Sequence, residues 1–365
     1  MAEEIAAPAE AVAPACLSDF DLEQLQAQFE RWGFPAVHAG RLLRSFYASG
    51  GSVDFPELKI GKELEATLRA NVPLLQSRIV TRSESSDGTV KLLIGMPESN
   101  GGGAVESVLM PLDTPGRAAA CVSSQIGCAM GCDFCASTKR GLERNLTSGE
   151  IVEQFLHLRS EALKLGRRLH TLVFMGMGEP MQNLDHVLAA IRRIAGEDMG
   201  ALGWRQITVS TVGIVPGIDR LADSGLNVNL ALSLHAPDDE TRSKIVPMNK
   251  RHPVAEIIAA TKRYFEKTRR ITNVEYCLLG GVNDSDAHAL ALAQLLRGFR
   301  THLNLIPYNS IGTGLSGAQY TSPSSERIDA FIAILRAEKV VTHLRKRRGD
   351  DVNAACGQLR ETLSS

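Results

Sequence analysis

Three cysteines lie close together in the segment Cys128-Ala-Met-Gly-Cys132-Asp-Phe-Cys135. Their C-x3-C-x2-C spacing supplies three thiolates from one loop, close enough to hold a single inorganic centre. A 4Fe-4S cluster has four irons, so three cysteine ligands leave one iron open to bind another molecule instead of only passing electrons. The spacing therefore predicts one 4Fe-4S cluster with an open iron.

Zinc binding and purely structural burial are the simpler interpretations of these cysteines. Structural zinc sites close with four ligands, often in C-x2-C pairs, and neither a second pair nor an H-x3-5-H run follows here. Inert buried cysteines would not require this spacing on a glycine-bearing loop. The cluster is therefore favoured over both alternatives.

The cysteine spacing resembles the signature of the radical SAM enzymes. In that superfamily the open iron holds the amino and carboxylate groups of S-adenosylmethionine (SAM). An electron from the cluster then splits SAM into methionine and a 5'-deoxyadenosyl radical. The resemblance implies a 4Fe-4S cluster and SAM as cofactors, with an external, flavodoxin-like one-electron reductant.

The composition is that of a globular protein from a reducing compartment. Hydrophobic residues make up 44% and charged residues 22% of the 365, and the net charge is -1, so RNA binding would depend on local basic patches. Seven unevenly spaced cysteines argue against a disulfide framework. The N-terminus lacks a basic signal region, and no apolar run is long enough to span a membrane. We expect a cytoplasmic protein without membrane contact.

Changes in pattern along the chain predict five segments. Residues 1–16, rich in Ala, Pro and Glu, are expected to be disordered. Residues 17–76 show helical spacing and are predicted to form an accessory domain, in which Arg41 and Arg44 either contact RNA or lie on a solvated face. Residues 77–114 alternate with period two around an Asp-Gly turn, which predicts a β-hairpin extension. Residues 115–350 would form the core, and residues 351–365 a loop that carries Cys356.

Strands and helices alternate after the cysteine loop. Such alternation predicts a parallel sheet covered by helices. About six units fit an open (β/α)6 partial TIM barrel better than a closed eight-fold barrel. The fold class is therefore α/β. The strands expected after the cysteine loop are 171–175, 206–210, 228–234, 273–279 and 302–307.

Small and polar residues follow several of these strands at their carboxyl ends, where barrels of this kind place their functional groups. Taken singly, each is more typical of a turn or of a satisfied polar residue at the end of a strand. Together, behind a cluster motif, they predict a coherent SAM pocket. The candidates are Gly178, Glu179, Ser210, Ser233, Leu234, His235 and Asn309.

Cys121 and Cys356 lie outside the cluster motif. Cys121 precedes the cysteine loop, and Cys356 lies in a polar loop after the basic run at 345–348. Such a run would lower the pKa of a nearby thiol and attract phosphate. A solvated charge run beside an unrelated thiol is the simpler interpretation, and the residues alone leave both open.

The chain resembles the RlmN/Cfr family of radical SAM RNA methyltransferases from about residue 20 to 360. The pairing of Cys121 with Cys356 points to this family, whereas the cluster motif alone points only to the superfamily. The motifs that carry the resemblance are Cys121-Val-Ser-Ser-Gln-Ile-Gly-Cys128, Arg144-Asn-Leu-Thr147, Gly176-Met-Gly-Glu-Pro180, Leu232-Ser-Leu-His-Ala236, Asn304-Leu-Ile-Pro-Tyr-Asn309 and Arg348-Gly-Asp-Asp-Val-Asn-Ala-Ala-Cys356-Gly-Gln-Leu359.

The resemblance implies a role for each candidate residue. Cys356 matches the cysteine that carries the methyl group, and Cys121 matches the cysteine that resolves a protein–RNA adduct. Glu106 matches the family's proton acceptor. The resemblance makes Cys128, Cys132 and Cys135 the cluster ligands. It makes the strand-end candidates Gly178, Glu179, Ser210, Ser233, Leu234, His235 and Asn309 the SAM contacts.

The activity implied is methylation of adenine carbon 2 in 23S rRNA, near the peptidyl-transferase centre, and in tRNA, 3' of the anticodon. Two SAM molecules would be used per turnover, and we expect a monomer. A Cfr-like methylation of carbon 8 uses the same motifs and stays open. A radical SAM activase or dehydrogenase with an auxiliary cluster would need further clustered cysteines. A metal-stabilised RNA-binding module would need neither Cys121 nor Cys356.

Overall fold

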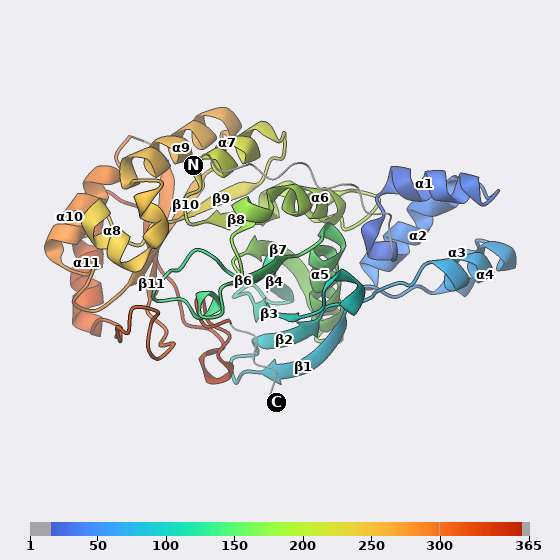
Figure 1. Cartoon of the computed structure of the whole chain (residues 1–365), viewed down its shortest axis with the longest axis horizontal. Coiled ribbons are helices and arrows are strands. Elements are labelled where there is room, and N and C mark those ends of the chain that lie inside the picture. Colours follow the sequence, from blue (N-terminus) through green and yellow to red (C-terminus); the bar gives the residue numbers. More distant parts are fainter. Residues whose placement is uncertain (1–15, 299, 360–365) are drawn as a thin grey trace.

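The computed structural model describes residues 16–298 and 300–359. Helices of the N-terminal segment form a unit that projects from one end of the molecule, and the remaining elements form a curved sheet with helices outside it (Figure 1). The predicted tail lies outside the described residues except for Cys16, which is buried. The N-terminal helices are α1 (Leu22–Arg31), α2 (Val37–Ala48), α3 (Phe55–Leu58) and α4 (Lys62–Asn71).

Antiparallel strands form one edge of the main sheet. The Asp87-Gly88 turn joins the first two strands as predicted, because Gly88 adopts a positive φ of 80°. These strands are β1 (Arg78–Glu84), β2 (Val90–Gly95) and β3 (Ala104–Pro111), and β3 pairs in turn with β4 (Arg117–Cys121).

Parallel strands continue the sheet from β4. Within residues 16–298 and 300–359 the sheet has ten strands, in the order β1-β2-β3-β4-β7-β8-β9-β10-β11-β12. The run from β4 to β11 is the predicted (β/α)6 partial barrel, and β12 adds one further parallel strand. The strands after β4 are β7 (Arg168–Phe174), β8 (Ile207–Thr211), β9 (Asn229–Ser233), β10 (Thr272–Leu278), β11 (Thr301–Pro307) and β12 (Thr342–Leu344).

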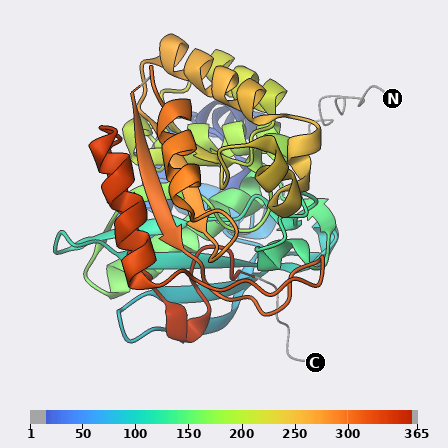
Figure 2. The same cartoon turned by 90° about the vertical axis from the view of Figure 1, so that its left-hand side faces the viewer.

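Helices cover the outer face of the parallel strands. Figures 1 and 2 show the last of them gathered at the end of the molecule opposite the N-terminal unit. Local sequence sets where they begin: Thr147 caps α5 by accepting from Glu150 N, and prolines lie at or just before the starts of α7 and α9. They are α5 (Ser148–Lys164), α6 (Leu184–Ala195), α7 (Val215–Asp223), α8 (Asp239–Ile245), α9 (Val254–Thr268), α10 (Asp286–Leu295) and α11 (Ser325–Ala337).

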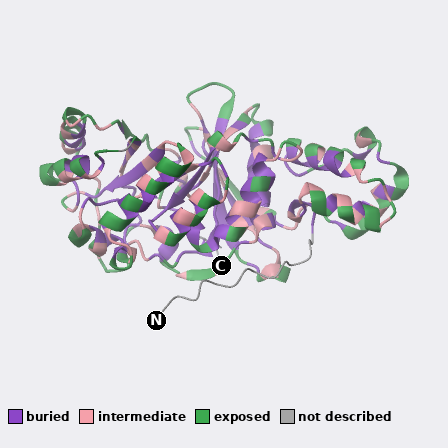
Figure 3. Ribbon diagram, turned by 90° about the horizontal axis from the view of Figure 1, so that it is seen from above, coloured by how far each residue is buried: buried purple, intermediate pink, exposed green. Residues whose placement is uncertain are grey.

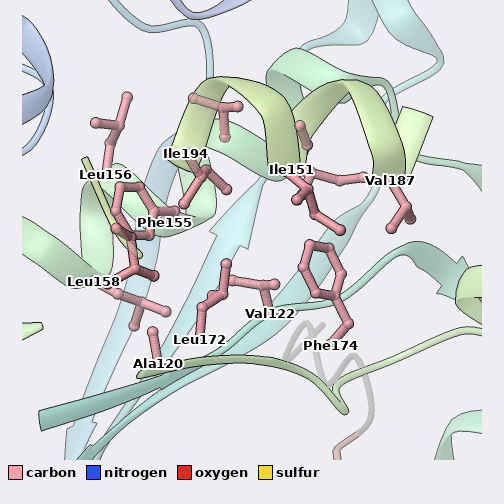
Figure 4. Packing of buried hydrophobic residues seen from close by; sticks show 14 of the residues in the cluster. Ala120, Val122, Ile151, Phe155, Leu156, Leu158, Leu172, Phe174, Val187 and Ile194 are labelled. Carbon is pink, nitrogen blue, oxygen red and sulfur yellow. The ribbon is translucent and has the colours of Figure 1, made fainter. Parts of the chain in front are cut away.

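The largest core lies between α5, α6 and the strands beneath them (Figure 4). Burying one such aliphatic or aromatic side chain stabilises the fold by about 1.5–3 kcal/mol. Seen from above, the strands are largely buried, while exposed residues lie on the outer helices and the N-terminal unit (Figure 3). The side chains in this contact include Ala120, Val122, Ile151, Phe155, Leu156, Leu158, Leu172, Phe174, Val187 and Ile194.

The structure adds four strands that the sequence analysis did not single out. Strand β4 was missed because Arg-Ala-Ala-Ala-Cys lacks the β-branched and aromatic residues typical of strands. Strand β12 is short. A separate two-stranded ladder flanks the cysteine loop: β5 (Gln125–Gly127) pairs with β6 (Leu142–Asn145). In the described residues, no helix is long and apolar enough to cross a lipid bilayer.

Candidate active site

One pocket opens at the carboxyl ends of the parallel strands. It contains about 970 Å³ of empty space, including open solvent at its mouth. It brings together the cysteine loop, the ends of β7 to β11 and the C-terminal loop. The predicted site residues that line it are Cys128, Cys132, Cys135, Gly178, Glu179, Ser210, Ser233, His235 and Cys356.

The three motif cysteines line this pocket from a single loop, which hydrogen bonds hold at its base. The loop is fixed at its base, where Cys128 N donates to Gly141 O at 2.8 Å. Gly127 has a φ of 73°, and a Cβ there would lie 1.9 Å from Gly141 O. Only glycine fits this close approach. The backbone therefore turns Cys128, Cys132 and Cys135 toward the same space.

The chemistry of this donor set fits a 4Fe-4S cluster. Burial raises the pKa of Cys128 to about 12 and that of Cys132 well above its ordinary value, and it raises the pKa of Cys135 as well. Bound iron would supply the positive charge that such thiolates need. No three His, Cys, Asp or Glu side chains in the described residues converge as ligands of one metal ion would. A cluster binds each thiolate to a separate iron.

A second loop holds the cysteine loop from outside through Asp133. Its carboxylate accepts from Ser316 N at 2.7 Å, from Ser316 Oγ at 2.6 Å and from Tyr320 Oη at 2.6 Å. Gly314 packs so closely that a Cβ would lie 2.4 Å from Asp133 O. These contacts fix the residue between two of the motif cysteines.

Gly178 and Glu179 form a tightly packed corner at the end of β7. Gly178 has a φ of 96°, and a Cβ there would lie 2.6 Å from the Gln125 side chain. The Glu179 carboxylate accepts from Met181 N at 3.0 Å and from Val212 N at 2.9 Å. Burial raises the pKa of Glu179 to about 7. The corner presents a buried carboxyl group to the pocket.

The predicted residues on β8 and β9 continue this wall. Ser210 Oγ and Ser233 Oγ lie 3.3 Å apart. His235 adopts a φ of 62°, and its Nδ1 accepts from Cys277 N at 3.0 Å. Burial lowers the pKa of His235 to about 3, so the ring is neutral, and because Nδ1 accepts a hydrogen bond, Nε2 carries the proton. Leu234 is fully buried and does not line the pocket.

Cys356, in the C-terminal loop, lines the pocket, whereas Cys121, at the end of β4, is not part of its lining. Burial raises the pKa of Cys121 to about 12, and the charge of Cys356 adds to this effect. Although Cys356 is exposed as a residue, desolvation of its sulfur raises the pKa of the thiol, whereas the Arg345 guanidinium lowers the pKa of both thiols. Asn309 Nδ2 donates to Cys356 O at 3.3 Å. Asn309 therefore supports the Cys356 loop, although it does not line the pocket.

Glu106 lies on β3, behind the pocket rather than in its lining. Its Oε1 pairs with Lys91 Nζ at 2.8 Å. The same Lys91 Nζ donates to Asn353 O at 3.3 Å, in the loop that leads to Cys356. Glu106 is thus connected to the Cys356 loop through one lysine.

Sequence reasoning missed Glu275, and it named Arg345 only as part of the basic run at 345–348. Glu275 lies inside the apolar strand β10 and lines the pocket. Arg345 pairs with it at 3.0 Å. A carboxylate within an otherwise apolar buried strand was the available signal for Glu275. Cys277, two residues further along β10, also lines the pocket and carries no assigned role.

The basic run at 345–348 makes specific contacts within the protein. Arg348 Nη2 pairs with Asp113 at 2.9 Å, and Lys346 Nζ lies 3.8 Å from the same residue. Arg347 Nη2 donates to a backbone carbonyl at 3.0 Å. Lys346 remains 77% exposed. The run therefore anchors the C-terminal loop, and RNA contact by it stays a prediction.

Comparisons with known proteins agree with this fold and site. The model of the Radical SAM superfamily matches residues 122–293. The chain is 50% identical over 344 residues to "Probable dual-specificity RNA methyltransferase RlmN 1" of Opitutus terrae, covering 94% of this chain and 96% of the relative. An RlmN relative in Rhodopirellula baltica is 44% identical over 345 residues, covering 94% and 90%. The crystal structure of a radical SAM methyltransferase from Sphaerobacter thermophilus superposes with a TM-score of 0.88 and 43% identity, covering 95% and 99%.

The partial barrel and its cysteine loop thus define a radical SAM enzyme, with a 4Fe-4S cluster and SAM as its cofactors. Within that superfamily, the chain belongs to the RlmN family of RNA methyltransferases.

Proposed function

We propose that this enzyme methylates carbon 2 of adenine in 23S rRNA, at the peptidyl-transferase centre, and in tRNA, at the adenine 3' of the anticodon. The observation that carries the proposal is that Cys356 lines the pocket beside the cysteine loop, while Cys121, from a distant part of the chain, lies near enough for the charges of the two thiols to interact. The relatives named dual-specificity RNA methyltransferases support two RNA substrates.

Covalent catalysis by Cys356 would solve the main chemical difficulty. Carbon 2 of adenine is electron-poor, so it does not attack the methyl group of SAM directly. The Cys356 thiolate instead takes a methyl group from one SAM by displacement. Arg345, which favours the ionised form of Cys356, assists this step. When bound, the cluster supplies the electron that cleaves a second SAM to a 5'-deoxyadenosyl radical.

The S-methyl group of Cys356 then becomes the bridge to RNA. It loses one hydrogen atom, and its carbon bonds to the adenine ring. The adduct then loses one electron, which the cluster, when bound, would take back, and it loses the ring proton, which we assign to Glu106. The Cys121 thiolate attacks the Cys356 sulfur, the sulfur–carbon bond breaks, and its electron pair takes up a proton on the new methyl group. A Cys121–Cys356 disulfide remains and must be reduced before the next turnover.

RNA would reach the pocket with its target base unstacked. The N-terminal helices and the exposed Lys346 are our candidates for contacts with the phosphate backbone. On helix α2, Arg44 pairs with Asp198, so any RNA contact by Arg44 would compete with that ion pair. We further propose that the enzyme works as a monomer with a flavodoxin-like electron donor.

Isotope labelling tests the proposal. Cluster-loaded enzyme, a reductant, CD3-labelled SAM and each RNA are combined without oxygen, and the nucleosides are analysed by mass spectrometry. We expect 2-methyladenosine that retains two deuteriums, because one leaves with the 5'-deoxyadenosyl radical. An 8-methyladenosine product would assign the Cfr-like reaction instead. No labelled adenosine from competent enzyme would overturn adenine as the substrate.

A further inference from the structure

Glu275 has one paired and one unpaired carboxylate oxygen. Its Oε1 accepts from Asn304 Nδ2 at 2.8 Å and from Arg345 Nη2 at 3.0 Å. Its Oε2 has no hydrogen-bond partner among the described residues, although Glu275 is only 3% exposed. Leaving a charged oxygen buried without a donor costs free energy. Because Glu275 lines the pocket, a bound molecule can supply the missing donor.

The surroundings of Glu275 fix where that donor must lie. Glu275 pairs in register with Ser233 of β9 and Asn304 of β11, so the side chain is held between two neighbouring strands. The positive charge of its partner Arg345 also interacts with the thiols of Cys121 and Cys356. Burial raises the pKa of Cys356, and the nearby Glu275 carboxylate adds to this effect. The open oxygen therefore belongs to the part of the pocket next to Cys356.

The base that bonds to the S-methyl carbon of Cys356 must lie beside the Cys356 sulfur. Adenine carries an amino group at carbon 6, with two N–H donors, whereas guanine carries a carbonyl oxygen there. A fixed carboxylate oxygen accepts a hydrogen bond from the first group and repels the second. A buried acceptor that only one base satisfies gives strong discrimination, because the wrong base leaves it unpaired.

We propose that Glu275 Oε2 accepts a hydrogen bond from the amino group of the target adenine and so selects adenine for methylation. The inference rests on the proposed function, since it takes RNA adenine as the base that meets Cys356. Arg345 and Asn304 act as positioning residues, because they hold Oε1 and leave Oε2 open. The SAM cofactor carries the same amino group, so the test must separate the two adenines.

The test compares two substrates in wild-type holoenzyme and in a Glu275→Ala variant. The substrates are tRNA anticodon stem-loops with either adenosine or purine riboside, which lacks the amino group, at the target position. In the wild type we expect kcat/KM to fall about 10- to 100-fold when the amino group is removed. In Glu275→Ala we expect a similar loss with adenosine and little further loss with purine riboside.

Two more variants guard against a simple folding defect. Glu275→Gln keeps the size and one neutral acceptor, so we expect an intermediate loss. Asn304→Ala removes a contact to Oε1 alone, so this variant should still discriminate between the two substrates. For every variant, iron content and the thermal unfolding midpoint are measured alongside activity.

Several results would overturn the inference. One is an additive loss of kcat/KM, in which replacing adenosine by purine riboside lowers kcat/KM of Glu275→Ala by as much as it lowers that of the wild type. Another is impaired SAM cleavage without RNA, measured as 5'-deoxyadenosine, which would assign Glu275 to the cofactor. Accumulation of the RNA adduct in Glu275→Gln would make Glu275 the acceptor of the ring proton. If wild-type enzyme methylated neither RNA, the proposed function would fail first and the inference with it.

Discussion

The two walls of the pocket differ in how completely their polar atoms are paired. In the wall formed by the ends of β7, β8 and β9, the β7–β9 wall, both carboxylate oxygens of Glu179 accept backbone N–H groups. In the wall formed by β10 and the C-terminal loop, the carrier wall, Glu275 Oε2 has no partner among the described residues. The same holds for Asn309 Oδ1, which supports the Cys356 loop from outside the pocket lining. Buried polar atoms in native proteins are nearly always paired.

The difference teaches how the two walls are used. The β7–β9 wall is fixed by the protein's own contacts and can receive a cofactor with little rearrangement. The carrier wall is incomplete without a ligand, and it holds the cysteine that we assign to methyl transfer. Substitutions in the carrier wall should therefore affect the reaction with RNA first, whereas substitutions in the β7–β9 wall should affect folding and cofactor retention.

Removing the carrier thiol should have the largest effect. We expect Cys356→Ala to lower RNA methylation by more than about 1000-fold, because the covalent route is lost. Cys121→Ala should retain methylation of Cys356 but trap the RNA adduct, which intact-mass spectrometry and denaturing gels detect. Cys277→Ala, which removes another thiol from the same pocket, should cost less than about tenfold. Normal product release by Cys121→Ala would contradict the resolving role.

Gly178→Ala should disrupt the β7–β9 wall before any RNA binds. A side chain there would be strained by the φ of 96° and would meet Gln125 at 2.6 Å, so we expect a loss of about 2–4 kcal/mol in unfolding free energy and a lower iron content. Gly225 has a φ of 74° with nothing within 4 Å, so Gly225→Ala should cost only about 1 kcal/mol. If the two variants lost the same unfolding free energy, the corner at Gly178 would tolerate a side chain.

The contrast between the walls also shows what sequence can predict. The cysteine motif is local, so its spacing alone indicates a cluster. Cys121 and Cys356 meet only after the barrel has formed, and their pairing came from the family resemblance rather than from any local pattern. Glu275 was missed because it is a single charged residue whose meaning depends on a neighbour distant in the chain, Arg345. Arg345 was named as part of the basic run, but its ion pair with Glu275 does not follow from that run. The alanine-rich strand β4 was missed because its propensity is weak and the surrounding sheet determines its conformation.

A smaller effect is expected where the cysteine loop is tied down. Tyr320→Phe removes one hydrogen bond to the Asp133 carboxylate but leaves both contacts from Ser316. We expect a cost of about 1–2 kcal/mol, with faster iron loss to a chelator. Tyr264→Phe removes a similar bond, to Val228 O at 2.9 Å, and should change stability without changing the rate of iron loss. If iron were lost at the same rate from both variants, the hydrogen bonds to Asp133 would not contribute to retention of the cluster.

The smallest effect concerns the hairpin that holds the Cys356 loop. Asp87 Oδ2 accepts from Gly349 N at 3.1 Å. Burial pushes the pKa of Asp87 up, but hydrogen bonds from Thr89 and Gly349 outweigh it and hold this pKa below its usual value of 3.8. Since the folded pKa is depressed, the contact contributes fully above about pH 4 and is lost as the pH falls through the folded pKa.

Amide hydrogen exchange at residues 349–356 measures this contact. At pH 6 the wild type should protect the loop about two- to fivefold more than Asp87→Asn, a difference of less than 1 kcal/mol, and the two should converge as the pH falls through the folded pKa of Asp87. Asp113→Asn is the control, because Asp113 pairs with Arg348 nearby but is 77% exposed, so its loss should matter less. Protection that stayed constant with pH in the wild type would mean that the carrier wall is held by its interior contacts, Asn309 and Arg345, rather than by the hairpin.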